Sequence, residues 1–317
     1  MTRAQTGSSD AAREARLLRL AALASVTTAA LLVVVKLFAW WATGSVSMLA
    51  SLLDSVLDGA ASLLTLLAVR YALVPADREH RFGHGKAEPL AALLQACMVL
   101  GSCAFIATEA VHRLLDPVAM TAILPAVLVM VFAIAATAAL TTMQGAVLKR
   151  TQSPAIHADR LHYLMDLFSN AATLVALALS ALGLPLADPI LALAIAAWML
   201  FAAREILGQA LDQLLDRELP TDERQLILDL ACGTPGVGFV NELRTRRAGR
   251  TRHVQLTLSF DAEQSLGAAV TIAETVKNAI LRRFADADVL VVLRAVHAGA
   301  TLEAERHCLG SAADEKS

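Results

Sequence analysis

The feature that most constrains how this chain folds is a series of apolar runs long enough to cross a lipid bilayer. A membrane-spanning helix needs about 20 mostly apolar residues. Six stretches reach this length: roughly 17–41, 45–72, 89–112, 119–147, 159–182 and 186–209. The chain as a whole is 56% hydrophobic, which is too apolar for an ordinary soluble domain. We therefore predict a membrane α-helical fold with six transmembrane helices, occupying residues 17–212.

Positive charge is distributed unevenly between the two ends of these spans. At one end, residues 42–44 and 183–187 carry none, and 113–118 carries Arg113 alone. The other end holds the remaining clusters: Arg13, Arg16, Arg19, Arg70, Arg78, Arg81, Lys86, Lys149, Arg150, Arg160, Arg204 and Arg217. Cytoplasmic loops carry the excess of Lys and Arg. We therefore expect a multi-pass inner (plasma) membrane protein with both termini in the cytoplasm and residues 1–16 as a cytoplasmic tail.

One basic residue lies inside the first apolar run. Lys36 is near the predicted outer end of that span, beside Trp40 and Trp41. Lysines near helix ends commonly bury their aliphatic stem and extend the ammonium group to the membrane interface. We therefore interpret Lys36 as a snorkelling residue rather than a functional one.

The character of the sequence changes after the sixth span. Residues 213–300 mix polar and apolar positions, in patterns that predict the order helix, strand, strand, helix, strand. The first of these helices is predicted to begin with Thr221 as its N-cap. This order indicates a small α+β cytoplasmic domain, and we expect residues 301–317 to be disordered. The formal net charge is −2 without a basic tail, which gives no reason to expect nucleic acid binding.

Ionisable residues occur in two of the predicted spans at matching intervals. Asp54 and Asp58 are four residues apart, and so are His162 and Asp166, so each pair shares one helix face. Three carboxylates and one imidazole from two helices could form a tetrahedral site for Zn²⁺, Fe²⁺, Co²⁺ or Cd²⁺. The alternative is polar contact between helices, but the spans do not offer a base for each of the three acids. An intramembrane ionisable residue favours the functional reading.

A second cluster lies in the cytoplasmic loop between the second and third spans. In the stretch PADREHRFGHGKAEP, Asp77, His80 and His84 are separated by three and four residues. An aspartate and two histidines could hold one divalent ion and leave a coordination position open. The alternative is an ordinary solvated polar loop, and these residues alone leave both readings open.

Four stretches of the sequence resemble the cation diffusion facilitator family, and most closely its bacterial zinc and ferrous-iron efflux branch. These are SLLDSVLDGAASLL, PADREHRFGHGKAEPLAAL, RTQSPAIHADRLHYLMDLFSN and LLDRELPTDER. The similarity extends from the first span to about residue 295. It implies a homodimer of six-span protomers with a ferredoxin-like cytoplasmic domain, embedded in the lipid bilayer. It also implies export of divalent metal from the cytoplasm in exchange for protons.

The resemblance also assigns roles to particular residues. The family's transport site falls on Asp54, Asp58, His162 and Asp166, and its loop site falls on Asp77, His80 and His84. An inter-subunit charge interlock falls on Lys86 and Asp216. Each position carries the residue type that the family pattern requires, which favours the metal-binding reading of the loop.

The cytoplasmic domain departs from the family pattern. Relatives carry a two-metal site there, and the matching positions are here Asn241, Thr257, Val270, Val292 and Arg294. None is a good zinc ligand, and Arg294 would repel a cation. His253, His297 and His307 do not fall on these positions, and we expect them to be solvated or satisfied locally. We therefore expect a domain that holds the dimer by apolar packing.

The function that these features predict is transport rather than catalysis. An intramembrane metalloprotease would need a motif such as HExxH, which the sequence lacks. We expect a divalent metal cation/proton antiporter working by alternating access, with Zn²⁺ as the leading substrate, no cofactor, and metal ions and protons as its partners. The alternative is a non-transporting regulatory or assembly paralogue. The donor set accepts several divalent ions, so the sequence does not select among them.

Overall fold

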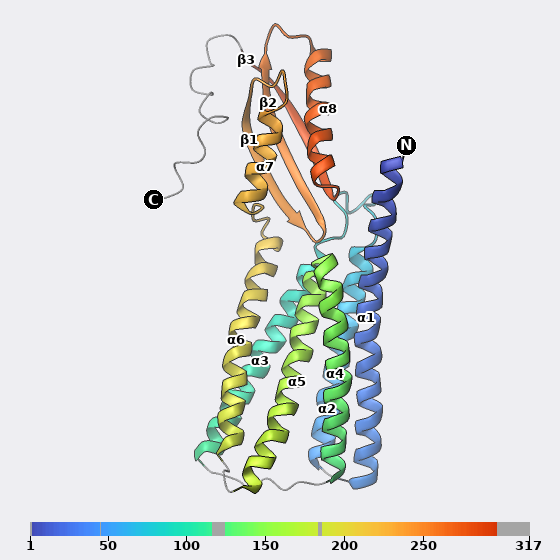
Figure 1. Ribbon diagram of the computed structural model, residues 1–317, viewed down its shortest axis with the longest axis vertical. Coiled ribbons are helices and arrows are strands. Elements are labelled where there is room, and N and C mark those ends of the chain that lie inside the picture. The colour runs from blue at the N-terminus through green and yellow to red at the C-terminus, as the bar shows by residue number, and fades with distance from the viewer. Residues whose placement is uncertain (1, 45, 116–123, 183–185, 297–317) are drawn as a thin grey trace. The chain divides into compact units, whose positions relative to one another are not determined.

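The computed structural model describes residues 2–44, 46–115, 124–182 and 186–296 (Figure 1). Within it the chain divides into two compact units, one ending at Asp212 and one beginning at Gln213. The first unit contains six long helices that run side by side in Figure 1: α1 (Thr2–Thr43), α2 (Val46–Ala72), α3 (Ala87–Leu115), α4 (Leu124–Thr151), α5 (Pro154–Ala181) and α6 (Ala187–Leu214).

Five of the six helices are both long enough and apolar enough to cross a membrane, within the part of the chain that the structure describes. These are α1, α2, α3, α4 and α6. The remaining helix, α5, has 28 residues and thus sufficient length, but it carries Asp159, His162 and Asp166. The helix that is least suited to lipid by composition therefore holds two of the four predicted intramembrane ligands, His162 and Asp166. The predicted helical membrane fold is confirmed.

Helix α5 is the central element of the membrane unit. It contacts α4, α3, α2 and α1, and a buried cluster that includes Met199 and Ala203 joins it to α6. Many of the contact positions are alanines, among them Ala92, Ala96 and Ala158. Small residues let helix backbones approach closely in a membrane. Large apolar side chains such as Phe105 and Phe201 instead point outward and are exposed, as expected of a surface that faces lipid.

The second unit has the predicted element order. It consists of α7 (Thr221–Cys232), β1 (Phe239–Ala248), β2 (Thr251–Asp261), α8 (Leu266–Arg283) and β3 (Ala287–Val296). The strand order is β1-β2-β3, with β2 antiparallel to β1 and parallel to β3 (Figure 1). A parallel neighbour requires a crossover connection, and α8 supplies it. The prediction of a small α+β domain is therefore confirmed.

The two helices of this unit cover the apolar face of its sheet. α7 contacts β1, α8 contacts β3, and the helices contact each other. Ile227, Leu256, Leu258, Val276 and Ile280 are completely buried between these layers. The prediction for the start of α7 was wrong. The N-cap is Pro220 and makes no side-chain cap bond, while Thr221 is already helical. Proline can precede a helix because its missing N–H is not needed there.

Candidate metal centre

The structure brings three of the four predicted intramembrane ligands together. Nε2 of His162 on α5 lies 2.8 Å from Oδ1 of Asp58 on α2 and 3.9 Å from Oδ2 of Asp166. One ligand atom from each residue falls within 4.8 Å of the others. The His162 and Asp58 side chains are 8% and 10% exposed. A buried group of one imidazole and two carboxylates from two helices has the chemistry of a divalent metal site.

The fourth predicted ligand, Asp54, is one turn away on the same face of α2. Its side chain is exposed and is outside the group formed by Asp58, His162 and Asp166. It still interacts electrostatically with Asp58 and His162. The structure therefore places Asp54 beside the group rather than inside it. Closing a four-ligand site would require its side chain to turn toward the other three.

Lys36 differs from the prediction made for it. Its side chain does not extend to an interface: the residue is 8% exposed, and Nζ donates a hydrogen bond to the backbone carbonyl of Ser51 on α2 at 3.1 Å. The charge of Lys36 also acts on the carboxyl groups of Asp54 and Asp166. The snorkelling interpretation was wrong because a residue's distance from the helix end does not reveal which neighbouring helix covers it.

Sequence reasoning missed a buried polar network centred on Asp159 of α5. Asp159 is completely buried. Its Oδ2 accepts hydrogen bonds from Ser25 on α1 at 2.6 Å and from Gln144 on α4 at 2.7 Å. Its Oδ1 accepts one from Gln95 on α3 at 3.2 Å, and the Gln95 amide also donates to Thr65 on α2 at 2.6 Å. One carboxyl group thus joins five helices, directly or through one further side chain.

Tyr163 links this network to the predicted metal ligands. Its hydroxyl lies 2.7 Å from Oγ of Ser62 on α2 and donates to the backbone carbonyl of Ser25 at 3.2 Å. Its ring lies 5.7 Å from the neighbouring imidazole of His162, centroid to centroid. The signal available in the sequence was Asp159 itself, an acid three residues before His162 in a predicted span.

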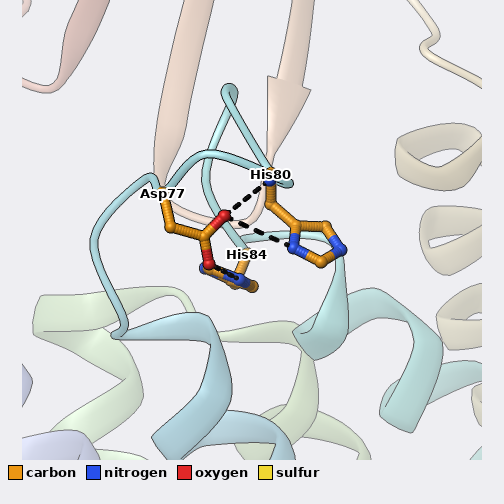
Figure 2. A group of neighbouring side chains, drawn as sticks. All are labelled: Asp77, His80 and His84. Atoms are coloured by element: carbon orange, nitrogen blue, oxygen red, sulfur yellow. Dashed lines mark hydrogen bonds and ion pairs between the residues drawn. The ribbon is translucent and has the colours of Figure 1, made fainter.

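The loop between α2 and α3 forms the second predicted cluster (Figure 2). Asp77 lies between the two imidazoles: its Oδ1 is 3.7 Å from Nδ1 of His80, and its Oδ2 is 3.4 Å from Nε2 of His84. One ligand atom from each residue again falls within 4.8 Å of the others. Gly83 adopts φ +79°, a conformation that favours glycine and turns the chain between the two histidines.

The three side chains of the loop cluster are held in place by contacts within the protein. The backbone N–H groups of His80 and Glu79 donate to Oδ1 of Asp77 at 2.6 and 2.9 Å, and these bonds lower the pKa of that carboxyl. The His84 ring packs edge-on against Tyr71 at a centroid distance of 4.4 Å and is almost fully buried. The carboxylate is therefore ionised well below neutral pH, and His84 is fixed while Asp77 and His80 face solvent.

The second unit contains no group of three potential ligands among its described residues, 213–296. Oδ1 of Asn241 accepts a hydrogen bond from Ser259, and Thr257 pairs in register with Val292 on β3. Nδ1 of His253 lies 3.3 Å from Asp288. His297 and His307 lie outside the described residues. The loss of the family's two-metal site from this domain stays a prediction.

The proposed charge interlock involves one residue from each unit. Asp216 accepts a hydrogen bond from Nη1 of Arg246 at 3.1 Å, within the second unit. Lys86 is half-buried and directly precedes the first residue of α3. A single chain does not test a contact between subunits, so this assignment stays a prediction.

Comparison with known proteins identifies the family. Residues 22–215 match the model of the cation efflux transmembrane domain, and residues 219–292 match that of the cation efflux protein cytoplasmic domain. The chain belongs to the cation efflux family. As a member of this family, which is also known as the cation diffusion facilitators, it is a multi-pass inner-membrane transport protein and not an enzyme.

Relatives in the cation efflux family are similar over most of their length. The chain is 49% identical to the cation-efflux pump FieF of Cronobacter sakazakii over 276 residues, which is 87% of this chain and 92% of that protein. It is 46% identical to FieF of Citrobacter koseri over the same shares. A solved MamM CTD variant in a nickel form is 24% identical, with a TM-score of 0.23, covering 24% of this chain and 99% of that one.

Proposed function

We propose that this protein exports divalent metal ions from the cytoplasm in exchange for protons, and that Asp54, Asp58, His162 and Asp166 bind the ion in transit. The observation that carries the proposal is the buried contact between His162 on α5 and Asp58 on α2. Three acids and an imidazole inside a helix bundle are costly unless a cation or protons neutralise them. The names of the FieF relatives support outward cation movement.

The residues also account for coupling to protons. Metal binding requires neutral imidazole and ionised carboxylates, so an ion that enters this site displaces protons, and protons that enter displace the ion. When the site opens alternately to the two sides of the membrane, this competition exchanges one for the other. The inward proton gradient then drives the metal outward.

The loop cluster is proposed as a cytoplasmic metal site separate from the transit site. Two of its three residues, Asp77 and His80, are exposed in the α2–α3 loop, which is expected to be cytoplasmic by the positive-inside rule. This position suits capture of ions before they enter the membrane. We further propose a homodimer with both termini cytoplasmic. The match of residues 219–292 to the family's cytoplasmic domain, whose model is named ZT_dimer, supports the dimer.

The test is metal transport in proteoliposomes that contain a pH-sensitive dye. We expect entry of Zn²⁺ or Cd²⁺ to be accompanied by opposite proton movement, and both fluxes to be lost in Asp58→Ala. Glu109→Gln is a matched control, because Glu109 is an exposed acid on α3 paired with Arg113. Transport by Asp58→Ala at the wild-type rate would refute the site. A panel of Zn²⁺, Fe²⁺, Cd²⁺, Co²⁺ and Mn²⁺ would then identify the substrates, with Zn²⁺ expected to lead.

A further inference from the structure

A buried lysine next to a group of carboxylates requires a physical explanation. Lys36 on α1 is 8% exposed, whereas Phe38 and Trp41 on the same helix point outward and are exposed. A buried ammonium group is strongly unfavourable unless it is hydrogen-bonded and paired with opposite charge. Lys36 satisfies the first condition through the carbonyl of Ser51, at 3.1 Å.

For the second condition, opposite charge is provided by the carboxylates of the proposed metal ligands, which interact with Lys36 electrostatically. Ser51 precedes Asp54 by one helical turn on α2, so the hydrogen bond fixes the ammonium group beside the start of the ligand face. The charge of Lys36 acts on Asp54 of α2 and on Asp166 of α5. A single cation from α1 therefore interacts with carboxylates of both helices that supply the ligands.

The charges give Lys36 a specific role. The three carboxylates of Asp54, Asp58 and Asp166 carry three negative charges when ionised, and the ammonium group of Lys36 contributes one positive charge. The set then holds two net negative charges, which one divalent ion neutralises while His162 stays uncharged. Without Lys36, the same site loaded with the same ion would keep one uncompensated negative charge inside the membrane unit.

We propose that Lys36 is a positioning residue that sets the charge balance of the transport site, matching it to a single divalent ion and weakening the hold on that ion so that it can leave. The inference rests on the proposed function, because it presumes that the four ligands bind the transported ion. Lys36 does not touch the ion. It acts through the carboxylates of Asp54 and Asp166.

A charge role and a purely structural role predict opposite results. If Lys36 only tied α1 to α2, its loss would loosen the ligand helices and weaken metal binding. If its charge counts, its removal strengthens the attraction between the carboxylates and a cation. Lys36→Gln keeps an amide donor for Ser51 and removes the charge, Lys36→Met removes both, and Lys36→Arg keeps both.

The experiment measures equilibrium Cd²⁺ binding to the full-length protein in nanodiscs by calorimetry at mildly alkaline pH. Binding that Asp58→Ala removes is assigned to the transport site. We expect Lys36→Gln and Lys36→Met to bind Cd²⁺ about tenfold more tightly at that site and to turn over more slowly in proteoliposomes. Lys36→Arg should remain within about threefold of the wild type.

A double variant provides a second measurement of the charge effect in case Lys36→Gln alone folds poorly. Asp54→Asn alone removes one negative charge, and adding Lys36→Gln restores the original net charge. We expect the double variant to bind Cd²⁺ more tightly than Asp54→Asn. Equal or weaker binding in Lys36→Gln or in the double variant would overturn the inference. A wild-type protein without Asp58-dependent binding would instead overturn the proposed function, and this inference with it.

Discussion

In the membrane unit, His162, Asp58 and Asp166 are shielded from solvent and project from two long helices, whereas in the α2–α3 loop Asp77 and His80 are half exposed. In both groups, three side chains each bring one carboxylate oxygen or imidazole nitrogen within 4.8 Å of the others. The free-energy cost of holding the charged side chains differs between the two groups. Exposed side chains stay solvated by water without an ion, whereas buried carboxylates need a cation or protons to neutralise their charge. Burial is therefore the stronger indication of obligatory function, and exposure fits an accessory role.

The largest expected effect comes from removing the imidazole that joins the two helices. His162→Ala deletes the contact to Asp58, so the remaining carboxylates lose their shared neutral ligand. We expect uptake of Cd²⁺ into proteoliposomes to fall by about a hundredfold or more. Glu109→Gln should transport at the wild-type rate. Retention of a tenth or more of wild-type transport by His162→Ala would show that the buried group is not the path of the ion.

The next effect tests the buried network that supports the ligands. Asp159→Asn replaces one acceptor oxygen by a donor, so at least one hydrogen bond from Ser25, Gln95 or Gln144 is lost. An unsatisfied buried group costs about 1–3 kcal/mol. We expect a melting temperature lower by several degrees for the full-length protein in detergent, and slower transport. Asp229→Asn, at an exposed position of α7, should melt like the wild type. An unchanged melting temperature in Asp159→Asn would contradict the network's structural role.

A smaller effect is expected at the loop. His80→Ala with His84→Ala should lower transport several-fold at limiting metal concentrations and leave the maximal rate nearly intact, because capture is impaired while the transit site is complete. Calorimetry should show fewer bound ions per protomer. His80→Ala alone separates ligation from packing, because His80 is half exposed while His84 packs closely on Tyr71. Unchanged binding stoichiometry in the double variant would refute the loop site.

The smallest effect lies in the second unit. Arg252 donates two hydrogen bonds to Glu223, both of 2.9 Å, and these bonds lower the pKa of Glu223 below its ordinary 4.5. The pair therefore stabilises the fold at neutral pH, and its contribution is lost as the pH falls below about 4.5 through the lowered pKa. Because the carboxylate is partly exposed to solvent, we expect about 1 kcal/mol or less.

Hydrogen exchange of α7 and β2 in the intact protein measures this contribution. Arg252→Gln should exchange faster than the wild type at neutral pH, and the difference should shrink on acidification. Arg244→Gln, which removes an exposed pair with Glu242, should have no such effect. A difference that grows as the pH falls would contradict the assigned direction of the Glu223 pKa.

The sequence predicted the elements well because periodicity and span length are local properties. The apolar runs and the α-β-β-α-β order required only short windows, and so did the spacing of Asp54 with Asp58 and of His162 with Asp166. Lys36 and Asp159 could not be interpreted in this way. Their environments depend on residues such as Ser51 and Gln144, which belong to other helices, and no local pattern states which helix faces meet.

The contact between His162 and Asp58 also depends on the position of α2 along α5. Successive residues of a helix rise by about 1.5 Å, and the two side chains are 2.8 Å apart. A slide of α2 along α5 by one helical turn, about 5.4 Å, would separate Asp58 from His162, while His162 and Asp166 would stay together on their own helix. A displacement far smaller than the bilayer thickness is thus enough to convert a complete binding site into half of one.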